Sequence, residues 1–260
     1  MKTAMCTLVI LRRPDHDWPL LIAANRDEMA DRPWLAPGRH WPDRDNVIAG
    51  QDELAGGTWL ALNDDGVVAG VLNRRGSLGP ADDKRSRGEL PLEACDHAEA
   101  RAAAEALAEL DPQSYRAFNL IVADARDAFW LAAREGSVAM RVEPLPVGLS
   151  MITAHDLNDR ESPRQRYHRP RFEAAPAPDP EGNGGDGDWF AWEALMASRD
   201  ADAERGPRGA MCVTTDYGFG TVSSSLVAVP SMERRFNGAR ARWRFSPGAP
   251  GQAAYGPVEL

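Results

Sequence analysis

The sequence has little lysine, few cysteines, no clustered histidines and no long apolar run. Lysine occurs only at Lys2 and Lys84, although Lys and Arg together number 30, a bias typical of a GC-rich bacterial genome. The three cysteines, Cys6, Cys95 and Cys212, are odd in number and far apart, which argues against a disulfide framework and a zinc site. The five histidines show no ligand spacing. We therefore expect neither a metal nor a cofactor.

The absence of long apolar runs bears on whether the protein spans a membrane or carries an export signal. Every apolar stretch is far shorter than the ~20 residues that a membrane-spanning helix needs, so we expect no membrane insertion. Residues 1–11 are a poor signal peptide, because the apolar segment is short and Arg12-Arg13 follow it rather than precede it. These features favour a cytoplasmic protein.

The formal net charge of −9 argues against nucleic acid or an anionic membrane as the default partner. Two arginine clusters stand against this background, one at 160–171 and one at 234–244. Each is typical of a solvated helix or strand face; the alternative is a site for an anionic ligand. In the second cluster Arg240, Arg242 and Arg244 alternate with other residues, which would place them on one face of a strand.

The order of predicted elements favours an α+β fold in a single domain over residues 1–260. Strands are expected at 6–11, 19–25, 58–63, 67–73, 118–123, 128–133, 138–142, 149–154, 210–215 and 222–229, and a hairpin over 234–245 turning at Asn237-Gly238. Helices are expected at 90–110, 160–174 and 189–198. The Pro, Gly and Asp residues of 176–188 predict a flexible loop.

The most informative feature is the start of the chain. Met5-Cys6 leads into an apolar strand, a polar turn follows, and a second apolar strand runs into Asn25-Arg26-Asp27-Glu28. Two such strands predict a β-hairpin, which returns the tetrad to the side of Cys6. A thiol, an arginine and two carboxylates would then share one end of a sheet.

Further motifs follow in a consistent order over about residues 5–230. They are Gly56-Gly57-Thr58-Trp59-Leu60, Gly66 to Asn73, Ser86-Arg87-Gly88-Glu89-Leu90, Phe118-Asn119-Leu120 and Gly220-Thr221-Val222-Ser223-Ser224-Ser225. Together with Met5-Cys6 and the tetrad, this series resembles the NRDE family, which includes the transport-and-Golgi-organisation proteins. The family in turn resembles N-terminal-nucleophile (Ntn) hydrolases, in particular cysteine acylases of the penicillin V acylase and bile salt hydrolase group. The resemblance implies a four-layer αββα sandwich of two mainly antiparallel sheets.

The resemblance implies a hydrolase of carbon–nitrogen bonds other than peptide bonds, with a small-molecule substrate. Cys6 would be the nucleophile once residues 1–5 are removed, because an Ntn enzyme uses the α-amine of its first residue as the base. By resemblance Asp27 would accept from that amine and Arg26 would favour the thiolate. Asn73, at the end of a predicted strand, is a candidate oxyanion donor, the alternative being simple strand termination. We expect Cys6, Asn25, Arg26, Asp27 and Asn73 to line one pocket.

Five further residues are candidates for substrate contact. They are Asn25, Glu28, Gly57, Trp59 and Asn158. For the tetrad the alternative is a polar turn. For Gly56-Gly57 it is a plain turn before a strand, and glycine there permits positive φ or a close backbone approach.

Two positions depart from the family pattern. Met151 stands where many members have asparagine after Leu-Ser, and Val222 stands where the usual motif has arginine. Asn158 is the candidate replacement for the missing amide. These departures favour a second hypothesis, a non-catalytic Ntn-fold protein that binds or carries a small apolar ligand such as haem, a lipid or acyl-CoA.

Overall fold

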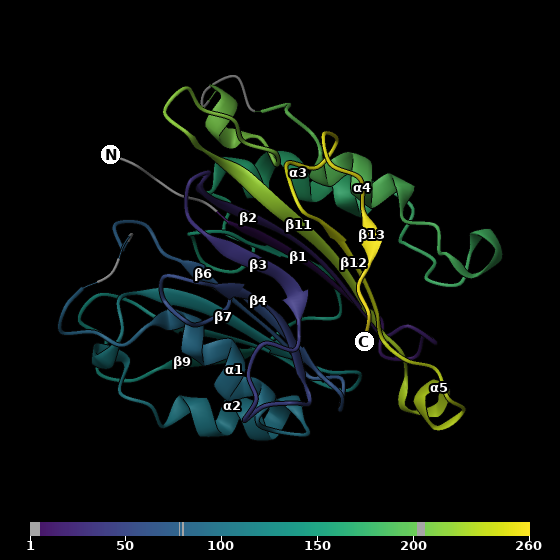
Figure 1. Cartoon of the computed structure of the whole chain (residues 1–260), viewed down its shortest axis with the longest axis horizontal. Coiled ribbons are helices and arrows are strands. Elements are labelled where there is room, and N and C mark those ends of the chain that lie inside the picture. Colours follow the sequence, from purple (N-terminus) through teal and green to yellow (C-terminus); the bar gives the residue numbers. More distant parts are fainter. Residues whose placement is uncertain (1–5, 78, 80, 202–205) are drawn as a thin grey trace. The chain divides into compact units, whose positions relative to one another are not determined.

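The computed structural model describes residues 6–77, 79, 81–201 and 206–260, and these fall into two compact units (Figure 1). One unit contains residues 32–145 together with Glu259 and Leu260; the other contains 6–31 and 146–258. The expectation of a single domain with a flexible loop near 176–188 stays a prediction. In the structure that loop is closed by paired backbone hydrogen bonds between Asp179 and Asp188.

The unit that contains Cys6 is built on a six-stranded antiparallel sheet in the order β10-β1-β2-β11-β12-β13. Its strands are β1 (Thr7–Arg12), β2 (Leu20–Met29), β10 (Gly148–Ile152), β11 (Phe219–Val229), β12 (Arg242–Ser246) and β13 (Gly256–Pro257). Its helices are α3 (Pro163–Ala174), α4 (Phe190–Met196) and α5 (Met232–Phe236), with 3-10 turns at Asn183–Gly185 and Gly206–Gly209.

The alternation of β1 and β2 decides which residues face α3 and α4. Val9, Leu21 and Ala23 form a buried core with aromatic and methionine side chains of these helices. Because side chains alternate between the two faces of a strand, Thr7, Asn25 and Asp27 belong to the same helix-facing side. Arg26 and Glu28 belong to the opposite side.

The tetrad lies inside a strand rather than in a turn. β2 continues to Met29 because β11 pairs with it over its whole length and satisfies its backbone. One irregularity interrupts this pairing. Thr221 lies opposite Asp27 and Ser223 opposite Arg26, so Val222 is the extra residue of a β-bulge.

The other unit is built on a seven-stranded antiparallel sheet whose strands follow chain order from β3 to β9. They are β3 (Trp34–Gly38), β4 (Val47–Asp52), β5 (Leu60–Asn63), β6 (Val68–Asn73), β7 (Phe118–Ala123), β8 (Ala128–Ala133) and β9 (Arg141–Pro144). Helices α1 (Leu90–Cys95) and α2 (Ala100–Ala108) pack on β5–β9, and 3-10 turns occur at Arg87–Glu89 and Pro112–Ser114.

Several predicted elements are wrong in detail. The single helix expected at 90–110 is two helices, because Asn63 donates to the carbonyls of Cys95 and His97 while Asp124 accepts from the backbone N–H of Ala100. Strands β3 and β4 were not expected in their proline-rich surroundings. β3 is a sheet edge, and Pro37 lies within the irregularity that interrupts its pairing with β4.

Two predicted strands of the C-terminal part are also wrong. Residues 210–215 form no regular strand and contribute one bridge, between Thr214 and Gly220. The first arm of the hairpin expected at 234–245 is helix α5. Asn237-Gly238 ends that helix instead of turning a hairpin, with Gly238 at a φ of 90°.

A close approach between two backbone segments explains why glycine occupies position 57. A Cβ atom on Gly57 would lie 2.5 Å from the backbone carbonyl carbon of Gly88. We expect Gly57→Ala to lower the free energy of unfolding by about 1–3 kcal/mol, the usual cost of forcing an extra carbon into packed structure. Urea unfolding measures this. Gly256→Ala, which meets no atom within 4 Å, should be nearly neutral, and equal midpoints for the two variants would contradict the prediction.

Among the described helices, none combines the length and apolar character that crossing a bilayer requires.

Candidate active site

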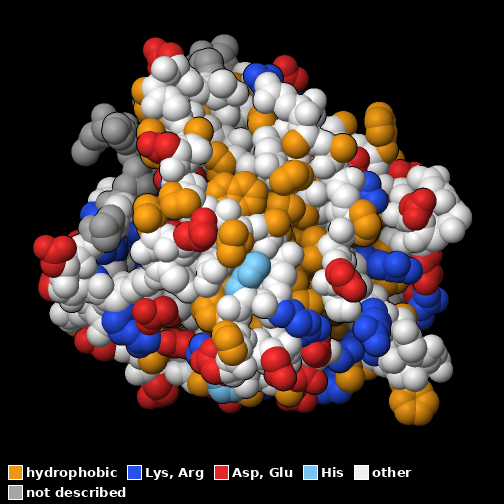
Figure 2. Space-filling model, viewed as in Figure 1, with side chains coloured by type: hydrophobic (Ala, Val, Ile, Leu, Met, Phe, Trp, Pro, Cys, Tyr) orange, Lys and Arg blue, Asp and Glu red, His pale blue; other side chains and the backbone are white. Residues whose placement is uncertain are grey.

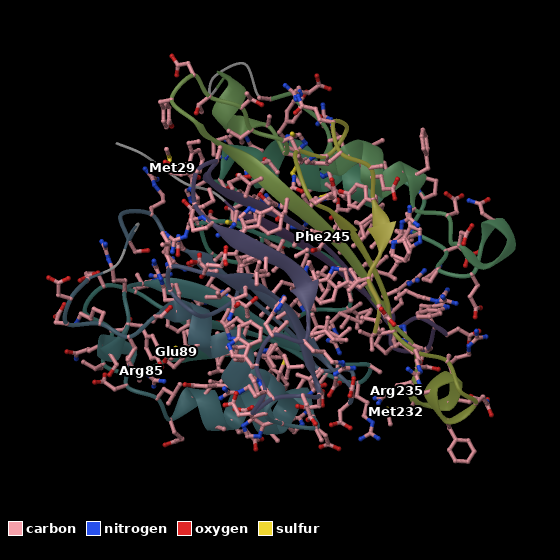
Figure 3. The ribbon with its side chains drawn as sticks, viewed as in Figure 1. Met29, Arg85, Glu89, Met232, Arg235 and Phe245 are labelled. Atoms are coloured by element: carbon pink, nitrogen blue, oxygen red, sulfur yellow. The ribbon has the colours of Figure 1, made fainter. Side chains whose placement is uncertain are left out.

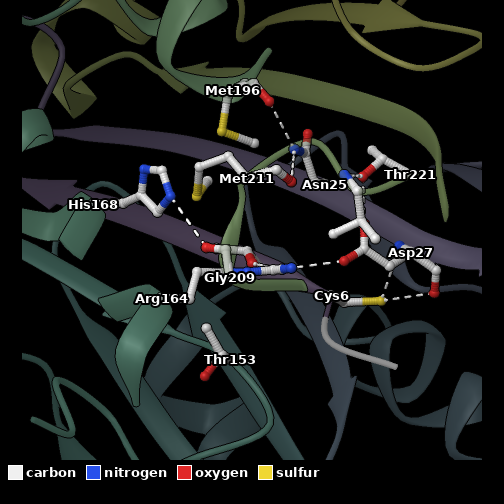
Figure 4. A network of polar contacts seen from close by, with 12 residues as sticks. Cys6, Asn25, Asp27, Thr153, Arg164, His168, Met196, Gly209, Met211 and Thr221 are labelled. Atoms are coloured by element: carbon white, nitrogen blue, oxygen red, sulfur yellow. Dashed lines mark hydrogen bonds and ion pairs between the residues drawn. The ribbon is translucent and has the colours of Figure 1, made fainter. Parts of the chain in front are cut away.

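Cys6 lies just before β1, at the point where the pairing of β2 with β1 ends and only β11 remains paired with β2. The Cys6 thiol donates to the Asp27 carbonyl at 3.6 Å and accepts from the Asp27 backbone N–H at 3.4 Å (Figure 4). The predicted return of the tetrad to the side of Cys6 is therefore confirmed for the backbone of Asp27. The sulfur takes both hydrogen-bonding groups of one strand residue, which fixes its place at the end of the sheet.

The Cys6 thiol is strongly disfavoured as a thiolate in the chain that retains residues 1–5. Burial, and next the negative charge of Asp27, raise the pKa of Cys6 to about 12, against which the Asp27 N–H and the Arg26 charge act weakly. The thiol is therefore neutral at pH 7. An arrangement of this kind needs a base close to the sulfur before it can attack a carbonyl carbon.

The Asp27 side chain lies at the centre of a buried polar network. Its Oδ2 accepts from Arg164 of α3 at 3.1 Å, and its Oδ1 accepts from the Thr221 hydroxyl of β11 at 2.6 Å. Arg164 also donates to the Thr7 hydroxyl at 2.7 Å. The side chains of Asp27 and Arg164 are 0% and 1% exposed, so this is a fully desolvated ion pair.

The residues of this network shift the pKa of the Asp27 carboxyl in opposite directions. Burial raises the pKa of its carboxyl, and the charge of Arg164 and the Thr221 hydrogen bond act in the opposite direction. On the far side of Arg164, burial and the same guanidinium lower the pKa of His168 to about 4. His168 is thus neutral at pH 7, and it contacts the Gly209 carbonyl at 3.2 Å.

Arg164 and Thr221 were not among the predicted site residues. Arg164 belongs to the 160–171 cluster, for which a solvated face was the favoured interpretation; for Arg164 that interpretation is wrong, because its side chain is buried. The alternation of side chains along β2 could have indicated that Asp27 needs a buried cation as its partner. Asp27 falls on the same side as Leu21 and Ala23, and a carboxylate on a buried face requires a cation partner.

The other predicted residues of this unit have defined contacts. Asn25 donates both amide protons to backbone carbonyls, of Met196 at 3.0 Å and Met211 at 2.9 Å, and so joins β2 to the end of α4. Arg26 is buried, on the side opposite Asp27. Glu28 accepts from the Met29 N–H through Oε1. Their predicted contacts with a substrate stay predictions.

Asn158 has a structural role in the loop after β10. Its Oδ1 accepts from the Met151 N–H at 2.9 Å, and its Nδ2 donates to the Ser150 hydroxyl at 3.2 Å. Its φ of 55° is left-handed, a conformation that asparagine tolerates better than most residues. Met151 itself is fully buried in the core beside α3 and α4. The substitution of asparagine by methionine at 151 therefore suits a packing position, and the predicted replacement of the amide by Asn158 stays a prediction.

Three predicted site residues belong to the other unit. Asn73 is the last residue of β6, as expected. Gly57 packs against the backbone of Gly88. Trp59 lies edge-on to Trp34 at 5.9 Å between ring centroids and covers Gly50. The roles predicted for them in binding or catalysis are untested by these contacts.

The described residues contain no group of three or more His, Cys, Asp or Glu side chains that could hold a metal ion.

Solved structures of proteins named as an amidase and a hydrolase have a similar fold. The N-acylethanolamine-hydrolyzing acid amidase ortholog of Caenorhabditis elegans is 13% identical, with a TM-score of 0.52 over 85% of this chain and 92% of that chain. A mutant of the conjugated bile acid hydrolase of Clostridium perfringens is 9% identical, with a TM-score of 0.53 over 98% and 97%. A second variant of that hydrolase is 10% identical, with a TM-score of 0.56 over 98% and 92%. The predicted Ntn-hydrolase-like α+β fold is confirmed by these similarities.

Sequence comparison identifies the family. No curated protein matches the chain in sequence. The profile of the family described as Transport and Golgi organisation 2 matches residues 5–182, which is more than half of the chain and includes Cys6, the tetrad and Arg164. The resemblance inferred from the motifs is confirmed, and the chain belongs to the Transport and Golgi organisation 2 family.

Proposed function

We propose that this protein is a cysteine Ntn amidohydrolase that acts on a non-peptide amide, with Cys6 as the nucleophile after removal of residues 1–5. One observation carries the proposal: Cys6 Sγ is held at the head of β1 by both backbone groups of Asp27. The C. elegans amidase and the C. perfringens hydrolase, both named for hydrolysis, supply the supporting analogy.

The raised pKa of Cys6 supports the need for processing. With residues 1–5 present, the backbone nitrogen of Cys6 is an amide and cannot take a proton. In a protein that begins at Cys6 this nitrogen is an α-amine with an ordinary pKa near 8, close enough to pH 7 to act as a base. The Asp27 carboxylate is the group proposed to orient this amine, and Arg164 and Thr221 hold that carboxylate in place.

The proposed reaction then follows in balanced steps. The Cys6 amine takes the thiol proton, and Sγ attacks the amide carbonyl carbon to form a tetrahedral oxyanion. Collapse breaks the carbon–nitrogen bond, and the leaving amine receives the proton from the Cys6 ammonium. A water molecule, deprotonated by the same amine, hydrolyses the thioester and releases the carboxylic acid with the thiol restored.

The direct test is amide cleavage by a protein whose first residue is Cys6. We expect release of free amine from at least one member of a panel of N-acyl amines, conjugated bile acids and lactams, followed by mass spectrometry. Cys6→Ser in the same processed form should lose nearly all of this activity, because the alcohol is a far weaker nucleophile. Protein retaining residues 1–5 serves as the second control.

A second candidate is a non-catalytic protein that binds a small apolar ligand such as haem, a lipid or acyl-CoA. Met151 and Val222, which replace an amide and a cation of the family pattern, are the observations that favour it. Absence of cleavage by the processed form across the whole panel, with the fold intact by circular dichroism, would make this candidate the better one.

A further inference from the structure

Helix α5 is a short exposed element at the end of β11 that plays no part in the site around Cys6. Ser231 begins it by accepting from the Arg234 N–H, and the Ser231 N–H donates to the Asp17 carbonyl at 2.8 Å. Arg234 forms ion pairs with Asp17 and Glu181. These contacts anchor α5 to the turn after β1 and to the 176–188 loop, so its orientation is fixed by named partners.

Two large apolar side chains of α5 project into solvent. Phe236 is 93% exposed and Met232 is 43% exposed. They are four residues apart, so they lie on the same side of the helix. Single exposed apolar residues are common on protein surfaces, but a nearly fully exposed phenylalanine beside a methionine is a small apolar ridge.

Arginines flank this ridge in the sequence. Residues 231–246 contain five arginines and one acidic residue, Glu233, in a chain whose net charge is −9. Two of the five are paired with carboxylates from elsewhere in the fold, Arg234 with Asp17 and Glu181, and Arg244 with Glu193. Arg240 and Arg242 are exposed and Arg235 is half-buried. Figure 2 shows Lys and Arg side chains gathered over this part of the surface, where an apolar side chain protrudes, and Figure 3 places Met232 and Arg235 on α5.

We propose that this α5 tip, defined as residues 231–242, docks the protein on an anionic lipid surface. Apolar side chains that insert among headgroups, flanked by cations that meet anionic lipids, are the pattern of peripheral membrane binding. A side chain that is 93% exposed stands clear of its own surface and does not line a groove. A stable protein partner would require about 800 Å² on each side, whereas insertion into a lipid interface requires only the ridge and its charges. The proposal does not depend on amide hydrolysis.

The test measures binding of the full chain to vesicles by co-sedimentation. We expect binding to vesicles of phosphatidylcholine and phosphatidylserine, little binding to phosphatidylcholine alone, and loss of binding as salt is raised. Phe236→Ser with Met232→Ser should weaken binding about tenfold or more, because the apolar surface of these two side chains can no longer insert into the lipid. Arg240→Ser with Arg242→Ser should weaken it about 25-fold, at roughly fivefold for each charge near the surface.

Phe190→Ser is the matched control. Phe190 is 78% exposed on α4 and lies outside the tip, so its loss should leave vesicle binding unchanged. An equal effect of the Phe190 and Phe236 variants would overturn the proposal, as would equal binding to the two kinds of vesicle. No binding to either kind of vesicle would also overturn it. Circular dichroism of each variant confirms that the fold is retained.

Discussion

Removing residues 1–5 should raise the rate of Cys6 alkylation by iodoacetamide about a hundredfold at pH 7. With these residues present, the pKa of Cys6 is about 12 and almost no thiolate exists at neutral pH. With a free α-amine and a thiol pKa near its ordinary ~8.5, thiolate at pH 7 rises roughly 3,000-fold. The less basic thiolate is also less nucleophilic, by about 40-fold over this range, which leaves a net gain of about a hundredfold.

The pH profile separates this cause from simple exposure of the sulfur. In the longer form the alkylation rate should climb steadily through pH 10, whereas in the processed form it should level off near the pKa of the thiol. Cys6→Ser in each form corrects for the buried thiols of Cys95 and Cys212. Equal rates in the two forms at pH 7 would contradict the role of the amine.

Arg164→Met should lower the free energy of unfolding by about 3–5 kcal/mol at pH 7, the usual result of leaving one charge of a buried pair without its partner. Asp27 would keep the Thr221 hydrogen bond and lose both the charge and the donor of Arg164. Urea unfolding measures the change. Arg169→Met is the matched control on the same helix, since its ion pair with Glu173 is partly exposed and contributes at most about 1 kcal/mol.

The loss caused by Arg164→Met should shrink as the pH falls. Burial raises the pKa of Asp27, so between the ordinary value and the raised one the folded state binds more protons than the unfolded state, and stability falls with rising pH. Without Arg164 this window extends to higher pH. Below about pH 3 the carboxyl is mostly neutral in both states, and its burial without a cation becomes much less unfavourable. A loss independent of pH would show that Arg164 acts through packing rather than charge.

A double variant isolates the pair. Asp27→Asn with Arg164→Met removes both charges at once and should destabilise the protein by less than the sum of the two single changes. Additive effects would contradict a direct interaction between the two side chains.

The opening hairpin could be predicted from sequence because both of its strands are continuous apolar runs. The position of Cys6 beside the tetrad followed from that hairpin alone. Its extension through the tetrad could not be predicted, because the partner that satisfies this part of β2 is β11, some two hundred residues away in sequence. The burial of Arg164 could not be predicted either, because its helix has little amphipathic pattern. Only the tertiary fold brings this side chain to Asp27.

Local propensity also failed where distant side chains end or begin a helix. Nothing in Asp96 to Glu99 resembles a helix break, and the break depends on Asn63 at the end of β5 and Asp124 in the turn after β7. At 234–245 the alternation of arginines with other residues correctly indicated a strand at Arg242 and Arg244, which belong to β12. The predicted strand began too early, because β12 starts only at Arg242. Asn-Gly there serves equally well as a helix end.

The β-bulge in β11 leaves the residue at 222 without the cross-strand pairing that holds the residues on either side of it. No β2 residue lies opposite Val222, while Thr221 and Ser223 on either side are committed to Asp27 and Arg26. The side chain at 222 can therefore change in size or charge without disturbing the ladder or the Thr221–Asp27 hydrogen bond. A lineage could exchange the arginine of the family motif for valine here and retain the fold. The same freedom makes 222 the place where an arginine could be restored by design, between two residues whose pairing with β2 remains in register.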